Sequence, residues 1–397
     1  MQKFMDPLFW YFVIIGAIWA YRARRALNAL QQIPVVDPNP KSKLPNLPRV
    51  TVIIPAKNEE KNIRQCLERF QKQDYANLQI IVVNDHSTDR TESILRTMDV
   101  PEITAELAVK FKRGAPAPIG YLNPPPTPEG WTGKNFAIHS AIPFAQGDWL
   151  LFTDADTRHE FTSVSAAIDH ALRRDLLYLT LLPKCLTGGL MERIIQPSAM
   201  GFLGLWFPIE KVNDPKSQSY FGNGQYLLIQ RKLYERIQGH EHVRSEFLED
   251  YAITRNVKAT GARFQCALGV SVYGTRMYDS LNAMWNGWRR IYLHAFQQNP
   301  KTLLQKYLSV LFFSVLPFAC FVPYLTMAFK HPERFGSGVG FAAVVSCFIL
   351  ITAWKTYGIV KANRLFSLLH PLAAFFISMF LLDAFWMALS KQKTIWR

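Results

Sequence analysis

Residues 149–159 read WLLFTDADTRH, and this stretch decides the predicted fold. Its first four residues are apolar, which predicts a short buried strand, and Asp154 and Asp156 follow directly. Side chains two residues apart on a strand point to the same side, so both carboxylates can face one divalent cation. Mg²⁺ is commonly held by one or two carboxylates together with substrate phosphates. The stretch therefore predicts a site for a metal-bound diphosphate, with an acidic turn that merely ends a strand as the alternative.

Two apolar segments earlier in the chain extend this prediction to a sheet. Residues 50–55 (VTVIIP) and 79–83 (QIIVV) are predicted strands, and each is followed by a polar turn and a helical pattern. This order is typical of an α/β domain with a parallel sheet. Ligands of such sheets bind beyond the carboxyl ends of the strands. Asn58, Glu59 and Asp85 follow these two strands, so we expect them to share a crevice with the aspartate pair.

Three later motifs place further polar groups at the ends of predicted elements. Residues 131–134 (WTGK) end with Lys134 at the start of a predicted helix, which is a natural place for an anion; an ordinary helix cap is the alternative. Residues 222–225 (GNGQ) predict a tight turn into a strand. Glu249 and Asp250 are paired carboxylates at the start of another predicted helix.

The middle of the chain has the composition of an ordinary globular domain, whereas both ends are apolar. The chain has 397 residues, a formal net charge of +15 and 49% hydrophobic residues. A net positive charge is compatible with binding to nucleic acid, to anionic lipid or to an anionic substrate. The sequence contains no helix-turn-helix, zinc-finger or RNA-binding motif, so we expect no nucleic-acid partner. The five cysteines lack CxxC spacing and are predicted to be reduced thiols of a cytosol-facing domain.

Four apolar stretches are predicted to lie in a membrane. Residues 8–21 form the first, and the arginines that follow place its C-terminal end in the cytoplasm. The others are residues 307–329, 339–354 and 368–389. Three later spans would leave the C-terminus outside although its basic residues favour the cytoplasm, so a re-entrant segment is the alternative. Asp383, inside the last stretch, is either functional or paired within the protein.

Six motifs, in this order, resemble those of membrane-bound family 2 glycosyltransferases with a GT-A fold. They are VIIPAKNEE (52–60), VVNDHSTDRT (82–91), WTGKNFA (131–137), FTDADT (152–157), GNGQ (222–225) and LED (248–250). The resemblance implies a nucleotide-sugar-binding domain, with a mostly parallel sheet and helices on both faces, plus N- and C-terminal transmembrane helices. Within the family, the sequence most resembles the carotenoid glycosyltransferases, which act on hydroxychlorobactene, diaponeurosporenoate and myxol-type carotenoids.

This resemblance divides the chain into five predicted parts. They are an N-terminal transmembrane anchor (1–25), a proline-rich linker (26–48), a GT-A glycosyltransferase domain (49–275), an amphipathic interfacial segment (276–304) and a C-terminal membrane region with about three apolar segments (305–397).

The resemblance also implies a role for each candidate site residue. The nucleotide-sugar is expected to contact Pro55, Ala56, Asn58, Glu59, Asp85, Lys134 and Asp154. Asp154 and Asp156 are expected to bind Mg²⁺ or Mn²⁺, which neutralises the leaving diphosphate. Asp250 is expected to be the general base for one displacement with inversion, with capping of the following helix as the alternative. The acceptor side is expected to comprise Gln225, Glu249, Trp288, Arg289 and Arg290.

The region after the predicted domain departs from processive members of the family. These carry a Gln-x-x-Arg-Trp motif, whereas residues 285–290 read WNGWRR, with tryptophan before arginine and no matching glutamine. The departure argues against a polysaccharide synthase and for the transfer of a single sugar. For Trp288, Arg289 and Arg290, an interfacial helix with aromatic and cationic anchors is the alternative to acceptor binding.

The sequence therefore predicts a hexosyltransferase in a lipid bilayer, with its catalytic domain facing the cytoplasm. We expect the donor to be a nucleotide-sugar of the UDP-glucose or GDP-fucose type, and the acceptor to be a lipophilic hydroxylated molecule, a carotenoid. A membrane-bound domain brings a cytosolic donor and a bilayer-dissolved acceptor together. The alternatives are another acceptor (ceramide, diacylglycerol or polyprenyl phosphate) and a non-catalytic membrane protein that only binds sugar nucleotide.

Overall fold

The computed structural model describes residues 7–39, 47–104 and 119–391. The chain divides into two compact units. The first, here called the sheet unit, comprises residues 33–186 and 209–277. The second, here called the helical unit, comprises residues up to 32, 187–208 and 278–394.

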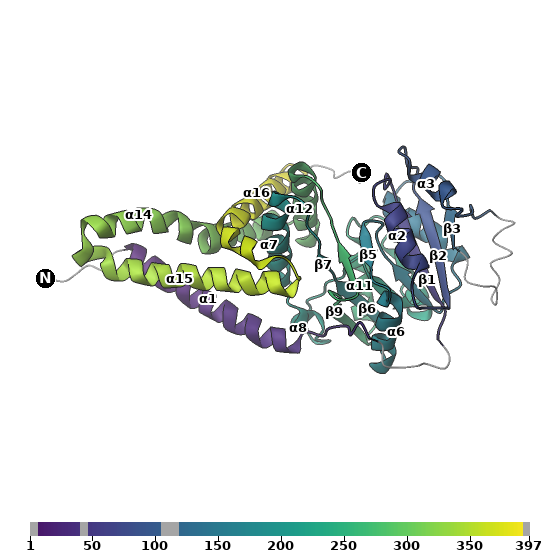
Figure 1. The fold of residues 1–397 in the computed structure, drawn as a ribbon, viewed down its shortest axis with the longest axis horizontal. Helices are drawn as coiled ribbons and strands as arrows, with labels where there is room; N and C mark the ends of the chain where they lie inside the picture. Colours follow the sequence, from purple (N-terminus) through teal and green to yellow (C-terminus); the bar gives the residue numbers. More distant parts are fainter. Residues whose placement is uncertain (1–6, 40–46, 105–118, 392–397) are drawn as a thin grey trace. The chain divides into compact units, whose positions relative to one another are not determined.

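A seven-stranded, mostly parallel sheet forms the centre of the sheet unit (Figure 1). Its order is β3-β2-β1-β4-β8-β6-β9. The strands are β1 (Val50–Ala56), β2 (Leu78–Asn84), β3 (Ile119–Leu122), β4 (Trp149–Phe152), β6 (Tyr178–Leu182), β8 (Leu227–Gln230) and β9 (Phe264–Leu268). Only β8 runs antiparallel to its neighbours β4 and β6. The predicted strands at 50–55, 79–83 and 149–152 therefore lie side by side in the order β2-β1-β4.

The register of these three strands brings their carboxyl ends together. Ala56 at the end of β1 pairs with Asn84 at the end of β2, and Ile53 pairs with Phe152 at the end of β4. Because parallel strands end on the same edge, the residues that follow each strand meet there. A small second sheet, β5 (Thr157–His159), β10 (Tyr273–Thr275) and β7 (Lys184–Cys185), begins just after the aspartate pair.

Helices cover both faces of the main sheet, as predicted. They are α2 (Ile63–Gln71), α3 (Thr91–Thr97), α5 (Gly133–Ala141), η1 (Ile142–Phe144), α6 (Ser163–Arg173), α8 (Ile209–Val212), α9 (Arg231–Arg236), α10 (Gly239–His242) and α11 (Glu249–Ala259). Successive strand residues point to opposite faces. Ile54 of β1 accordingly packs in one buried cluster with Leu67 of α2, whereas Ile53 packs in another with Ile138 of α5 and Ile253 of α11.

The helical unit contains three helical stretches that are long and apolar enough to cross a membrane. They are Pro300–Lys330, Pro332–Ile359 and Arg364–Leu389. These contain the three predicted C-terminal segments, and the middle one is longer than expected, at 28 residues against 16 in the sequence prediction. The individual helices are α13 (Pro300–Val310), the π-helical η2 (Leu311–Val315), α14 (Leu316–Lys330), α15 (Pro332–Ile359), η3 (Arg364–Leu369) and α16 (His370–Leu389).

The N-terminal helix packs against this apolar region. Helix α1 (Pro7–Gln32) is formed as predicted. It is not among the three stretches that are long and apolar enough to cross a membrane. Phe12 of α1 stacks on Tyr324 of α14 with ring centroids 6.0 Å apart. Trp19 donates a hydrogen bond from Nε1 to the Phe313 carbonyl oxygen over 2.7 Å. The helix is therefore tied to α14 and η2 by both apolar and polar contacts.

Helices α7 (Leu190–Trp206) and α12 (Leu281–Ala295) complete the helical unit and pack against α16. Asp383 of α16 accepts hydrogen bonds from Trp285 Nε1 at 2.7 Å and from Arg289 Nη1 at 3.1 Å, both on α12. The structure thus pairs the one acidic residue of this apolar helix, which favours the structural alternative for Asp383.

We expect Asp383→Ala to destabilise the helical unit by about 1–3 kcal/mol, because the Arg289 charge and the Trp285 indole would both lose their acceptor. The melting temperature of the detergent-solubilised chain measures this loss. Asp383→Asn is the matched control: it keeps an oxygen acceptor for Trp285, so its loss is expected to be smaller. An unchanged melting temperature in Asp383→Ala would contradict this role.

Candidate active site

The ends of β1 and β2 bring Pro55, Ala56 and Asp85 together. The Asp85 backbone N–H donates to the Ala56 carbonyl oxygen over 2.8 Å, and both residues are buried. The Asp85 carboxylate lies 3.3 Å from Lys57 Nζ and 3.2 Å from His86 Nδ1. The Asp85 carboxylate is thus buried at this strand end with basic groups beside it, and its contact with a nucleotide-sugar stays a prediction.

Asn58 joins the turns that follow β1 and β2. Its backbone is in the left-handed region, with φ of 58°, which asparagine tolerates better than most residues. Its Oδ1 accepts from the Thr88 backbone N–H at 2.8 Å, and its own N–H donates to Ser87 Oγ at 3.0 Å. The contacts of Asn58 in this structure are therefore those of a residue that fixes both turns.

Glu59 lies within the electrostatic reach of the aspartate pair. Its Oε2 accepts a hydrogen bond from Asn62 Nδ2 at 2.8 Å. Burial raises the pKa of Glu59, the bond from Asn62 opposes this, and the Asp154 and Asp89 carboxylates raise the pKa further. The turn after β1 and the loop after β4 thus contribute acids to one site.

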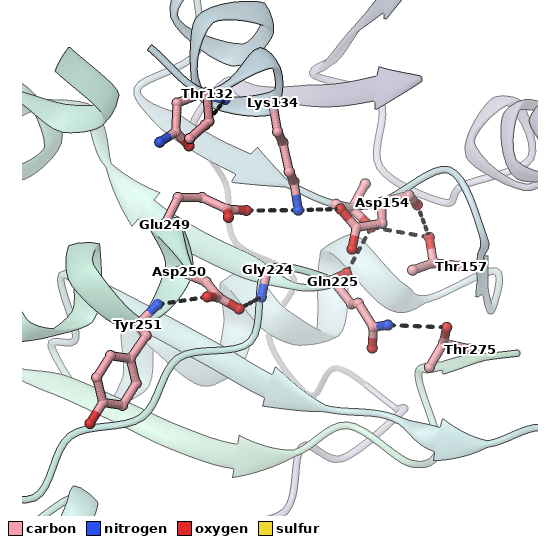
Figure 2. Close-up of polar contacts among 12 residues, drawn as sticks. Thr132, Lys134, Asp154, Thr157, Gly224, Gln225, Glu249, Asp250, Tyr251 and Thr275 are labelled. Atoms are coloured by element: carbon pink, nitrogen blue, oxygen red, sulfur yellow. Dashed lines mark hydrogen bonds and ion pairs between the residues drawn. The ribbon is translucent and has the colours of Figure 1, made fainter. Parts of the chain in front are cut away.

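Lys134 bridges two carboxylates in the middle of the site (Figure 2). Its Nζ lies 2.7 Å from Asp154 Oδ1 and 2.7 Å from Glu249 Oε1. Thr132 caps α5 by accepting from the Asn135 N–H, which places Lys134 in the first turn of that helix. Burial alone would lower the pKa of Lys134, but the two carboxylates outweigh burial and hold the pKa well above its ordinary value. The ammonium is therefore charged throughout the physiological range.

Asp156 has one carboxylate oxygen to which no described residue donates. Its Oδ1 is buried and has no hydrogen-bond partner among the residues that the structure describes. Burial, then the Asp154 and Glu59 carboxylates, raise the pKa of Asp156 well above its ordinary value. An orphaned buried carboxylate oxygen beside a second carboxylate is a position that a cation would satisfy.

The residues present therefore fit a divalent cation, although they do not form a complete protein cage. Within residues 7–39, 47–104 and 119–391, no three His, Cys, Asp or Glu side chains lie close enough to hold a metal by themselves. Mg²⁺-type sites commonly use only one or two carboxylates and take their other ligands from substrate phosphates and water. Asp154 and Asp156 match that requirement.

Asp250 is held by two backbone amides. The N–H of Gly224 donates to its Oδ2 and the N–H of Tyr251 donates to its Oδ1, each over 2.7 Å (Figure 2). Burial, and then the neighbouring Glu249 carboxylate, raise the pKa of Asp250 to about 7. A carboxylate that titrates near neutral pH has the basicity that a general base needs.

The GNGQ turn requires its glycines because it runs against α11. A Cβ at Gly222 would collide with Thr254 Oγ1 and with the Asp250 carbonyl oxygen. A Cβ at Gly224 would lie 3.3 Å from both Asp250 Oδ2 and Lys134 Nζ. The absence of side chains here lets the backbone approach the acidic residues closely.

Gln225 is buried at the junction of the two sheets. Its Nε2 donates to Thr275 Oγ1 of β10 over 3.3 Å, and its carbonyl oxygen accepts from Thr153 Oγ1 at 2.8 Å. Gln225 thus ties the glycine turn to both the aspartate loop and the small sheet. Its predicted acceptor-side role stays a prediction.

The other three predicted acceptor-side residues belong to α12 in the helical unit. Trp288 is 1% exposed and donates from Nε1 to Gln196 Oε1 of α7 over 2.9 Å. Arg289 pairs with Asp383, and Arg290 Nε donates to the Asn286 carbonyl oxygen. Their contacts within this unit are structural, and acceptor binding by them stays a prediction.

A buried network behind the aspartate pair escaped the sequence analysis. Thr157 Oγ1 donates to the Asp154 carbonyl oxygen over 2.7 Å, and Thr153 Oγ1 donates to the Gln225 carbonyl oxygen. His159 Nε2 lies 3.0 Å from each of these two hydroxyl oxygens. Because both hydroxyl hydrogens are already used, Nε2 must carry the proton that it donates to them.

The remaining ring nitrogen of His159 then accepts a hydrogen bond. Its Nδ1 lies 3.0 Å from Ser163 Oγ, which supplies the hydrogen. Burial, and then Arg69, lower the pKa of His159 to about 3, so the ring is neutral. Threonine and histidine at alternating positions of β5 point to one side of that strand, and this spacing was the available sequence signal.

We expect His159→Leu to lower the free energy of unfolding by about 2–4 kcal/mol, because three buried hydroxyl groups would lose their shared partner. The exposed His242, replaced in the same way, is the matched control. The wild type should lose stability as the pH falls from about 6.5 towards 3, because the unfolded chain takes up a proton that native His159 refuses. Equal stability of both variants at all pH values would rule out this positioning network.

Part of the sheet unit matches the sequence profile of a known protein family. Residues 51–105 match the sequence profile "Glycosyl transferase family 2". This match and the relatives described next confirm the predicted resemblance to family 2 glycosyltransferases and the GT-A fold.

Individual relatives refine this assignment. The chain is similar to 4,4'-diaponeurosporenoate glycosyltransferase of Staphylococcus haemolyticus (strain JCSC1435), with 26% identity over 262 residues, or 61% of this chain and 60% of the relative. It is also similar to beta-monoglucosyldiacylglycerol synthase of Nostoc sp. (strain PCC 7120), with 30% identity over 28% of this chain and 21% of the relative. The chain thus spans about three-fifths of the length of the first relative.

One solved structure shares the fold over nearly the whole chain. The mannosyltransferase PcManGT from Pyrobaculum calidifontis, in complex with GDP-Man and Mn²⁺, matches with a TM-score of 0.54. The match covers 97% of this chain and all of the other, at 18% sequence identity. At that identity, the likeness speaks for the fold alone.

Proposed function

We propose that this protein is an inverting glycosyltransferase that moves one sugar from a nucleotide-sugar to a hydroxyl of a membrane-dissolved acceptor. The observation that carries the proposal is Asp250, a half-buried carboxylate held by two amides, with its pKa raised to about 7, beside the Asp154–Lys134–Glu249 ion pairs. A general base and a site for a charged diphosphate, side by side, are what a single displacement at an anomeric carbon requires.

The donor would bind at the ends of β1, β2 and β4. Asp85 and Glu59 would hydrogen-bond the nucleoside, with Pro55, Ala56 and Asn58 shaping the turn around it. Lys134 would contact the diphosphate. We propose a UDP- or GDP-sugar of the UDP-glucose or GDP-fucose type; the similar fold of a mannosyltransferase in complex with GDP-Man supports a nucleotide-sugar donor.

Asp154 and Asp156 would hold Mg²⁺ or Mn²⁺. When bound, the ion supplies positive charge that neutralises the diphosphate leaving group. The orphaned Asp156 oxygen supports this assignment from the structure, and the Mn²⁺ in the complex of the mannosyltransferase agrees with it.

Asp250 would carry out the proton transfer. Its carboxylate takes the proton of the acceptor hydroxyl while that oxygen forms a bond to the anomeric carbon, and the bond from that carbon to the diphosphate oxygen breaks on the opposite side. One displacement inverts the anomeric configuration. The amides of Gly224 and Tyr251 fix both carboxylate oxygens, so the base is oriented before the acceptor arrives.

The acceptor is proposed to be lipophilic, a hydroxylated carotenoid in the first instance. The three apolar helical stretches support a membrane location, and we propose that the sheet unit faces the cytoplasm, where nucleotide-sugars are found. Similarity to a diaponeurosporenoate glycosyltransferase favours the carotenoid. Similarity to a beta-monoglucosyldiacylglycerol synthase favours diacylglycerol as the second candidate acceptor.

Pigment and lipid extraction from an expression host tests this function. The host should make hydroxylated carotenoids and express either the wild type or Asp250→Asn. A glycosylated carotenoid found only with the wild type is the expected result. A new glycolipid with unchanged carotenoids would move the acceptor to the second candidate. Absence of any new glycoside, with UDP- and GDP-sugars present, would contradict the proposed function.

A further inference from the structure

The Lys134 ammonium lies beside Asp154, one of the two proposed metal ligands. Lys134 Nζ contacts the same Asp154 carboxylate that a metal would need, at 2.7 Å from Oδ1. Its second contact, with Glu249 Oε1, is equally short, and the Lys134 and Glu249 side chains are 15% and 8% exposed. Asp154 is thus already ion-paired with Lys134 in the ligand-free protein. Asp156 Oδ1, in contrast, has no partner among the described residues.

We propose that Lys134 is an internal counter-ion that competes with the metal for Asp154, and that the nucleoside diphosphate relieves this competition. This inference rests on the proposed function, since it assumes a metal-bound diphosphate donor. Metal and nucleotide would consequently bind with positive coupling, and the free protein would hold metal only weakly.

Loss of one partner is costly for the Lys134 ammonium, because its side chain is only 15% exposed. Metal binding alone would break the Lys134–Asp154 pair and leave the ammonium with Glu249 as its remaining carboxylate contact. Removing one partner of a buried ion pair is strongly unfavourable. A diphosphate brings new anionic oxygens for the ammonium, so the cost of breaking the pair disappears when both ligands are present.

Gly224 lies directly beside the contact between Lys134 and Glu249. A Cβ on Gly224 would lie only 3.3 Å from Lys134 Nζ and 3.2 Å from Glu249 Oε1. With no side chain at Gly224, nothing stands between the backbone of the turn and the ammonium, and the general base Asp250 lies at the same point. Coupling between two ligands is reciprocal, so nucleotide would strengthen metal binding by the same factor by which metal strengthens nucleotide binding.

Mn²⁺ binding to the full chain in detergent, measured by the electron paramagnetic resonance signal of free Mn²⁺, tests the proposal without turnover. MnCl₂ is titrated alone and then with UDP or GDP. For the wild type we expect the nucleotide to tighten Mn²⁺ binding at least about tenfold. For Lys134→Met we expect Mn²⁺ alone to bind about tenfold tighter than in the wild type, with the coupling reduced to about twofold or less.

Two controls separate this role from general electrostatics. Lys134→Arg keeps the charge and should keep weak binding of Mn²⁺ alone, and Lys72→Met removes an exposed charge of the same unit and should change nothing. Tighter binding in Lys72→Met as well would reduce the effect to net charge and overturn the proposal.

A role of Lys134 that is limited to contact with the diphosphate predicts a different result. If Lys134 only contacts the diphosphate, Lys134→Met will weaken nucleotide binding and leave the affinity for Mn²⁺ alone unchanged, which overturns the proposal. Should Lys134→Met not fold, Mn²⁺ affinity of the wild type that is independent of nucleotide would overturn it by itself. The proposed function is tested separately, since the wild type can form a glycoside in the host whether or not Lys134 couples the binding of Mn²⁺ and nucleotide.

Discussion

Asp250→Asn is expected to lower the rate of sugar transfer at least about a hundredfold, because general bases contribute about 10²–10⁴ to rate. The asparagine keeps the shape of the side chain and its one oxygen can still accept from either the Gly224 or the Tyr251 amide, so the fold and donor binding should survive with one hydrogen bond lost. Measured with saturating donor, the loss should therefore fall on kcat, with little change in the KM for the nucleotide-sugar.

The raised pKa of Asp250 also predicts how the rate of transfer changes with pH. The base works only when ionised, and its pKa is raised to about 7, so kcat/KM should rise with pH up to about 7 and then level off. In Asp250→Asn the residual rate should lose this acid limb. The matched control is Asp175→Asn, an exposed aspartate of the same unit paired with Arg263. A variant Asp250→Asn that retained the wild-type rate and pH profile would remove Asp250 from the chemistry.

Asp156→Asn is expected to stabilise the ligand-free protein while abolishing metal-dependent transfer. The Asp156 side chain is half-buried near Asp154 and Glu59, with its Oδ1 fully buried, and its raised pKa means that its charge opposes folding at neutral pH. Replacing the charge with an amide removes that repulsion, so the melting temperature should increase. Metal chemistry supplies several kcal/mol, so transfer should fall at least about a hundredfold.

A thermal-shift experiment with and without MnCl₂ and nucleoside diphosphate checks both parts of the Asp156 prediction. The wild type should gain stability from the ligands together, and Asp156→Asn should lose most of that gain. Asp175→Asn should match the wild type throughout. A lower melting temperature in Asp156→Asn with an intact ligand shift would show that the residue is structural.

Most of the sheet unit could be predicted from local pattern. The apolar runs at 50–55, 79–83 and 149–152 are fully buried strands, and buried parallel strands read as continuous apolar segments. Polar residues directly after them mark the strand ends. The strand after the GNGQ turn, β8, was predicted as well, but its antiparallel place between β4 and β6 was not, because pairing partners far apart in sequence leave no local signal.

The candidate site was predicted as a set of residues but not as a set of contacts. Lys134, Asp154 and Glu249 come from three separate elements, and no spacing in the sequence shows that one lysine bridges the two acids. The short distances arise from the tertiary fold alone. For the same reason the predicted diphosphate role of Lys134 gave no hint of its pairing with Asp154.

The three long apolar helical stretches show the limits of apolar runs as boundary markers. The segment predicted at 339–354 belongs to a helix that begins at Pro332 and ends at Ile359. Charged residues and glycines occupy its first turns, so they dilute the apolar signal without ending the helix. Helix ends follow backbone hydrogen bonding and caps, which hydropathy does not report.

Release of UDP or GDP by the purified full chain in lipid nanodiscs tests the proposed chemistry most directly. Each nucleotide-sugar is supplied with Mn²⁺, with and without a hydroxylated carotenoid in the bilayer, and the wild type is compared with Asp250→Asn. We predict release that depends on the carotenoid in the wild type and is lost in the variant. Release at equal rates by both proteins, or none from either donor with any acceptor, would contradict a glycosyltransferase that uses Asp250 as its base.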